Sequence, residues 1–133
     1  MIDIGPEEGK SYEKQEFTKR PIKVSGLKDE QLGGLQGFEN AEDLTRLGTA
    51  YLFWDKLNEF YYNDVVVCAY NNEGSPVGTI PRATAEKIIE EYNNGKKFDA
   101  VVCMIKKKPD KGDFMPPDIK EVQIIVNIYT EKK

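Results

Sequence analysis

Apolar and polar side chains alternate along the C-terminal part of the chain. Val122, Ile124, Val126 and Ile128 are separated by single residues, and this period of two is typical of a β-strand with one face in a hydrophobic core. Other apolar runs, several of them rich in valine or aromatic residues, predict further strands. The expected strands are Ile22–Leu27, Ala50–Leu57, Asp64–Asn71, Pro76–Ile80, Phe98–Ile105 and Val122–Tyr129.

A different period marks the clearest helix, which we expect over Thr84–Asn93. Ala85, Ile88, Ile89 and Tyr92 fall at positions i, i+3, i+4 and i+7, so they would form one apolar stripe along a helix. The glycine that follows two residues after the segment is typical of a helix C-terminus. This segment therefore predicts an amphipathic helix packed against the strands.

A second, shorter helix is predicted between the first two strands. Asn40, followed by Asp43, is typical of a helix N-terminus, because short polar side chains cap free backbone N–H groups there. Leu44 and Leu47 would supply the buried face of this helix, and Gly48 its end.

The chain has 133 residues, the size of one domain. Residues 1–20 mix charges with few apolar residues, so we expect a flexible N-terminal lead-in before a single domain over residues 21–133. Helices alternate with strands too rarely for a parallel α/β sheet. The expected fold is mainly β (α+β), a small, partly open barrel with five or six strands and two short helices.

Composition excludes much catalytic chemistry. The chain has no histidine and two cysteines, Cys68 and Cys103, in apolar runs that predict two buried thiols rather than a disulfide. The chain therefore lacks histidine, the usual general base at neutral pH, and has too few ligands for a tetrahedral zinc site. We expect no enzyme activity, no cofactor and no metal site.

The same composition indicates where the chain works. No apolar stretch approaches the roughly 20 residues needed to cross a bilayer, and the first residues do not read as a secretory signal. We therefore expect a cytoplasmic protein with no membrane association. The net charge is −4, which opposes strong non-specific binding to nucleic acid but leaves room for a local basic groove.

Aromatic and basic residues form the most suggestive functional pattern. Tyr62 precedes a predicted strand, Arg82 precedes the predicted helix and Phe114 lies in a long loop, with lysines concentrated nearby. Aromatic faces that stack on bases, beside cations that hold phosphates, are typical of single-stranded nucleic-acid binding. Core aromatics with lysines that serve solubility are the alternative interpretation.

The order of elements resembles the HIRAN domain family. The closest match runs over Asp64–Phe98, which reads DVVVCAYNNEGSPVGTIPRATAEKIIEEYNNGKKF. Its most specific piece is the segment Glu73–Arg82, which reads EGSPVGTIPR. Ile22–Leu27 resembles the family's opening strand. HIRAN domains are small barrels related to oligonucleotide-binding folds. Some accompany DNA repair proteins and bind the 3′ end of single-stranded DNA, and others stand alone in bacteria and phage.

The resemblance implies a set of nucleic-acid-binding residues. Lys28 and Arg82 would contact phosphate, Tyr62 and Phe114 would stack on bases, and Asn63 and Thr79 would recognise a hydroxyl. Four positions depart from the family pattern. Tyr61 stands where the family has a proline, Asn63 where it has an aspartate, Val65 where it has an asparagine and Asp29 where it has an aromatic residue.

Two functions are therefore in view. The first is a non-catalytic module that recognises single-stranded DNA or a DNA 3′ end. The second is a protein-interaction module that keeps the barrel and has lost DNA binding, with a protein partner held by aromatic anchors such as Trp54 or Tyr61. A carboxylate-based hydrolase ranks third. The sequence leaves the oligomeric state open.

Overall fold

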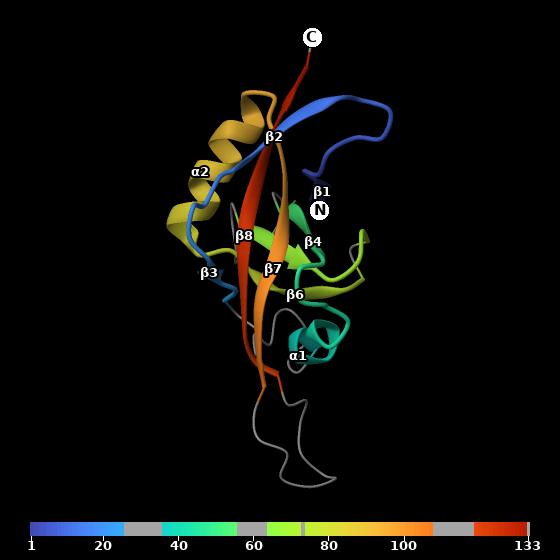
Figure 1. Cartoon of the computed structure of the whole chain (residues 1–133), viewed down its shortest axis with the longest axis vertical. Coiled ribbons are helices and arrows are strands. Elements are labelled where there is room, and N and C mark those ends of the chain that lie inside the picture. Colours follow the sequence, from blue (N-terminus) through green and yellow to red (C-terminus); the bar gives the residue numbers. More distant parts are fainter. Residues whose placement is uncertain (26–35, 56–63, 73, 108–118, 133) are drawn as a thin grey trace, which may run out of the picture.

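The computed structural model describes residues 1–25, 36–55, 64–72, 74–107 and 119–132. Eight strands and two helices lie in this part of the chain (Figure 1). They are β1 (Ile2–Asp3), β2 (Tyr12–Glu16), β3 (Ile22–Lys23), α1 (Gln36–Ala41), β4 (Thr49–Asp55), β5 (Asp64–Cys68), β6 (Pro76–Thr79), α2 (Arg82–Asn93), β7 (Lys97–Lys107) and β8 (Ile119–Glu131). The fold is mainly β, as predicted, with more strands than the five or six expected.

All strand pairs of the sheet are antiparallel. The order is β2-β8-β7-β4-β5-β6, with β1 paired to β4 and β3 paired to β8 off this path. The long strands β7 and β8 run side by side along the molecule, and α2 lies beside them (Figure 1). The strand ladders form an open sheet. Within the described residues, no helix is long and apolar enough to span a membrane.

The hydrophobic core lies on one face of β7 and β8. The alternation predicted for the last strand is confirmed, since Val122, Ile124 and Val126 are fully buried. On α2, the predicted apolar stripe supplies Ala85, Ile88 and Ile89 to the same core. Both cysteines are free thiols, as expected. Cys68 is buried, whereas Cys103 is only half-buried.

The first 20 residues do not form the loose lead-in that we expected. They hold β1 and β2, and Ile4 is fully buried. The N–H of Ile4 donates to the carbonyl of Leu52 at 3.3 Å, and the N–H of Phe98 donates to the carbonyl of Ile4 at 2.8 Å. The N-terminal segment therefore fills the gap between β4 and β7. Because most side chains of these short strands are exposed, the sequence shows no alternation of apolar and polar residues that would predict them.

The short helix lies earlier than predicted. α1 ends at Ala41, close to where the predicted helix begins, and turns follow it. Leu44 is buried as expected, but Leu47 is 71% exposed with a φ of 68°. The N–H of Leu47 donates to the carbonyl of Val102 at 2.7 Å, so this residue is tied to β7 rather than to a helix.

A short segment after β3 connects two parts of the sheet. The N–H of Val24 donates to the carbonyl of Val122 on β8 at 2.9 Å. Ser25 and Thr79 exchange two backbone hydrogen bonds, of 2.9 and 2.8 Å. A Cβ at Gly78 would collide with the carbonyl oxygen of Ser25, so this close crossing requires glycine. The segment therefore contacts β8 at one end and β6 at the other.

Candidate functional site

Two of the six predicted site residues, Thr79 and Arg82, lie in the described part of the chain. The other four, Lys28, Tyr62, Asn63 and Phe114, lie outside the described residues, as does Tyr61. Trp54, predicted as an anchor for a protein partner, is only 6% exposed and belongs to the core. That expectation was wrong, because the apolar face of β4 turns this aromatic residue inward.

Thr79 closes β6 and is half-buried. The register places it opposite Val66, which in turn lies opposite Phe53. Directly opposite residues on neighbouring strands point to the same face. The side chain of Thr79 therefore shares a face with a second, smaller apolar cluster formed by Phe53, Val66 and Cys68.

Arg82 is the first residue of α2, and its side chain is 80% exposed. Its Nε lies 3.6 Å from Oε1 of Glu86, one turn further along the helix. An exposed pair of this kind contributes about 0–1 kcal/mol, so it holds the guanidinium only weakly. The N-terminus of a helix also favours anions, because its first N–H groups point outward. The position of Arg82 therefore suits contact with an anion.

Three separate chain segments meet beside Thr79 and Arg82. Ser25 bonds to Thr79, as described above, and the N–H of Ile80 donates to the carbonyl of Val65 at 2.9 Å. Ser25 precedes Lys28 by three positions, and Val65 follows Asn63 by two. Ser25 thus flanks Lys28 in the sequence, and Val65 flanks Tyr62 and Asn63. The structure brings Ser25 and Val65 together beside Thr79 and Arg82, the two site residues that it describes.

Phe114 belongs to a different connection. It lies in the sequence between Lys107, the last residue of β7, and Ile119, the first of β8. The described residues do not relate it to Thr79 or Arg82.

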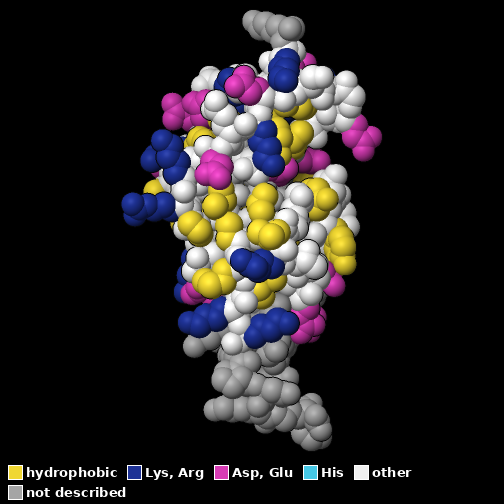
Figure 2. Space-filling view, in the orientation of Figure 1, with side chains coloured by type: hydrophobic (Ala, Val, Ile, Leu, Met, Phe, Trp, Pro, Cys, Tyr) yellow, Lys and Arg dark blue, Asp and Glu magenta, His cyan; other side chains and the backbone are white. Residues whose placement is uncertain are grey.

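Charge around the junction of β6 and α2 is mixed. Lys23, at the end of β3, pairs with Glu121 at 3.2 Å, and Arg82 pairs with Glu86. On the face shown in Figure 2, Lys and Arg side chains are interspersed with Asp and Glu. Among the described residues on this face, the basic side chains do not form a continuous band.

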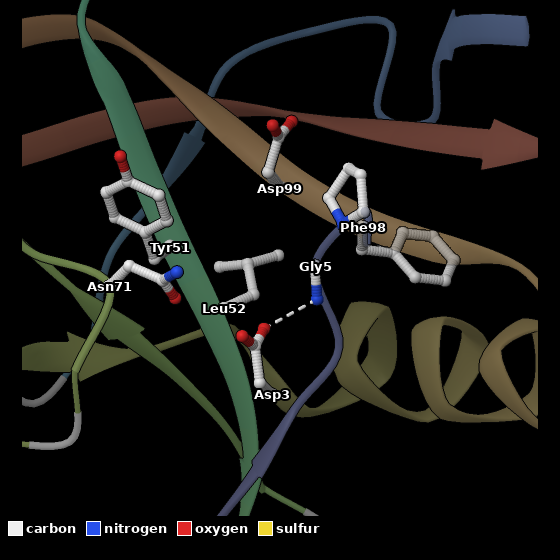
Figure 3. Close-up of a pocket in the computed structure, with 8 residues that line it drawn as sticks. Asp3, Gly5, Tyr51, Leu52, Asn71, Phe98 and Asp99 are labelled. Carbon is white, nitrogen blue, oxygen red and sulfur yellow. Dashed lines mark hydrogen bonds between the residues drawn. The ribbon is translucent and has the colours of Figure 1, made fainter. Parts of the chain in front are cut away.

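Sequence reasoning missed a small pocket beside the N-terminal segment (Figure 3). Its volume is about 60 Å³, room for about two water molecules. Figure 3 shows Asp3 and Asp99 on two sides of the pocket, and Oδ1 of Asp3 accepts a hydrogen bond from the N–H of Gly5 at 2.8 Å. The lining residues are Asp3, Gly5, Pro6, Tyr51, Leu52, Asn71, Phe98 and Asp99.

Asp99 is the electrostatically unusual residue of this pocket. Burial raises its pKa above the ordinary value of 3.8, against the opposing effect of hydrogen bonds from Tyr129 and Asn127. The hydroxyl of Tyr129 donates to the carboxylate at 2.9 Å, and Nδ2 of Asn127 donates at 3.2 Å. Burial and the neighbouring Asp99 likewise raise the pKa of Tyr129.

The pocket does not amount to a metal centre. No group of three or more Asp, Glu, Cys or His residues within the described ranges is placed to hold an ion. The sequence around Asp99 alternates between core residues, Phe98 and Ala100, and this pattern could have predicted that Asp99 faces away from the core. No such pattern marks Asp3, because its place in the pocket depends on the pairing of β1 with β4.

Comparison of the chain with models of known protein families, with curated proteins and with solved structures gives no match in any of the three.

Proposed function

We propose that this chain is a non-catalytic module that binds single-stranded DNA, in particular its 3′ end, at the junction of β6 and α2. The observation that carries the proposal is the meeting of Ser25, Val65 and Thr79 at that junction. In the sequence, Ser25 precedes Lys28 by three positions, Val65 follows Asn63 by two and Thr79 precedes Arg82 by three. In this proposal, one ligand at the junction contacts cationic, aromatic and hydroxyl groups.

The finer form of the fold belongs to the same proposal. The bonds from Val24 to β8 and from Ser25 to β6 support a small, partly open barrel of the HIRAN-like kind. One segment contacts both β8 and β6, which lie far apart in the strand order β2-β8-β7-β4-β5-β6. In oligonucleotide-binding barrels, a strand face and its adjoining loops grip the nucleic acid. Thr79 and Arg82 flank such an edge here.

Each group has a chemical role in the proposal. Arg82, exposed at the first turn of α2, contacts a phosphate together with Lys28. Tyr62 and Phe114 stack on bases, and Asn63 and Thr79 recognise the terminal hydroxyl. No general base or nucleophile takes part, because binding alone requires none.

A titration of labelled single strands with free and with blocked 3′ ends tests this function. We expect the free end to bind more tightly. Tyr62→Ala should weaken binding by about ten- to a hundredfold, because one stacked base is worth about 1–3 kcal/mol. Tyr70→Ala, at an exposed tyrosine in the turn before β6, is the matched control. Absent binding, or equal loss in both variants, would exclude the proposal.

A further inference from the structure

A second hollow lies on the face of β7 and β8 that points away from the core. Its volume is about 370 Å³, about that of a dozen water molecules. Figure 2 shows hydrophobic side chains gathered across the middle of the face presented by β7 and β8. We call this hollow the outer groove. It is lined by Lys14, Gln15, Glu16, Leu47, Val101, Cys103, Ile125 and Asn127.

The floor of the outer groove is apolar where a solvated face would be polar. Val101 lies opposite Ile125 in the register, and both are half-buried. Their neighbours along β7, Ala100 and Val102, are fully buried in the core on the other face. An antiparallel sheet with one solvated side normally alternates apolar with polar residues. Here both faces of the sheet are apolar at this point, which is typical of a surface that is covered.

Leu47 stands beside the groove in a strained conformation. It is 71% exposed, and its φ of 68° is in the left-handed region, which bulky residues rarely adopt. The bond from its N–H to Val102 holds it there. The next residue, Gly48, is needed for space, because a Cβ there would collide with Oγ1 of Thr45. A strained residue that exposes a large apolar side chain indicates a function for that side chain.

The rim of the groove carries charges of both signs. Lys14 lies opposite Tyr129 and Glu16 opposite Asn127, so both share the outer face with the groove floor. A two-fold axis that passes between Lys14 and Glu16 would place Lys14 of each copy near Glu16 of the other. Leu47, an exposed apolar side chain, lies at the edge of the apolar hollow, so one face carries both parts of an apolar contact between two copies. The opposite charges on the rim therefore allow this face to pair with a second copy of itself.

We propose that the outer groove is the contact surface of a homodimer, in which two copies pack their β7–β8 faces together around a two-fold axis. Leu47 of each copy fills the groove of the other. This inference is independent of DNA binding at the β6–α2 junction, since it uses none of the residues proposed to hold DNA.

Sedimentation of the full chain over a concentration series tests the dimer. Leu47→Asn keeps a residue that tolerates the left-handed conformation but removes the apolar side chain. Burying one leucine side chain lowers a dissociation constant by roughly ten- to a hundredfold. Because each dimer buries two, the variant should raise the dimer Kd by about a hundredfold or more. Tyr70→Ser, an exposed aromatic outside the groove, should leave the Kd unchanged.

Leu47→Gly separates dimerisation from folding. Glycine adopts a positive φ without strain, so this variant should unfold at a temperature no lower than the wild-type monomer while losing the dimer. A charge exchange supplies the second control. Lys14→Glu and Glu16→Lys should each weaken the dimer by about two- to fivefold at low salt, and the combined variant should restore it.

Each outcome bears on the dimer directly. Loss of the dimer in both Leu47 variants, with recovery in the combined charge variant, supports the proposal. A dimer that persists unchanged in the Leu47 variants overturns it. A wild-type chain that stays monomeric up to about 1 mM also overturns the proposal, because a Kd of 1 mM corresponds to a binding free energy of only about 4 kcal/mol. The groove would then be assigned to a different partner.

Discussion

Gly78 is the residue on which the crossing of Ser25 over β6 depends. A Cβ at this position would meet the carbonyl oxygen of Ser25 and Cγ1 of Val24, and neither the backbone nor the buried valine can move freely. Gly78→Ala should therefore destabilise the fold by about 1–3 kcal/mol through overpacking. Urea unfolding measures this loss.

The control for that substitution is Gly5→Ala. The added Cβ would lie 3.1 Å from Oδ1 of Asp3, which accepts a hydrogen bond from the N–H of Gly5 but belongs to an exposed side chain that can shift by a few tenths of an ångström. We expect a change within about 0.5 kcal/mol there. Equal stability of the two variants would show that Ser25 does not pack closely against β6.

Asp99 makes stability depend on pH. Burial raises its pKa in the folded state, so the folded protein binds a proton more readily than the unfolded chain does. Asp99 consequently costs stability once it ionises, and this cost grows as pH rises from the ordinary value of 3.8 to the raised value. Asp99→Asn keeps an oxygen that can accept from Tyr129 and removes the charge.

The stability of Asp99→Asn relative to wild type should therefore improve from pH 3 to pH 7, as measured by urea unfolding at both values. Asp3→Asn, at the exposed carboxylate on the other side of the pocket, serves as the control. A relative stability of Asp99→Asn that is constant over this range, or that falls with pH, would contradict the assigned effect of burial.

At the scale of single elements, the first turn of α2 sets how freely Arg82 can meet a phosphate. Glu86 lies 3.6 Å from the guanidinium and competes for it. Glu86→Gln removes this competing charge, so affinity for single-stranded DNA should rise about two- to fivefold at low salt. The effect is measured by the same titration as above.

Glu90→Gln is the matched control for this substitution, since Glu90 is an exposed glutamate one turn further along α2. Both variants change the net charge by the same amount. If both raise affinity equally, the gain reflects net charge alone and Arg82 has no special part in binding.

Elements with a long or regular pattern were predictable from the sequence. β8 was predicted from its period of two, α2 from its period of 3.6, and the pairing of β5 with β6 from the turn at Asn71 and Asn72. α1 was not, because Asn40 and Asp43 resemble a helix start, yet the helix ends at Ala41. Side-chain caps and turns use the same residues, so local sequence does not separate the two.

At the scale of the whole molecule, the candidate site depends on contacts between distant parts of the chain. Ser25 bonds to Thr79 and Val65 to Ile80 through backbone groups, which nearly every residue type carries. Their meeting therefore has no sequence signature of its own. The resemblance suggested Thr79 and Arg82 as one site, but the pocket at Asp99 and the exposed Leu47 follow only from long-range pairing.

The last prediction concerns how strongly salt weakens DNA binding by this chain, whose net charge is −4. With Lys28 and Arg82 as the proposed phosphate contacts, few counterions are released on binding. Each phosphate contact on a single strand contributes about −0.7 to the slope of log K against log salt. We therefore expect a slope of about −1.4, and Arg82→Gln should reduce its magnitude by about 0.7. A slope near zero would mean that no phosphate is contacted, and a much steeper one would require cations that the proposed site does not include.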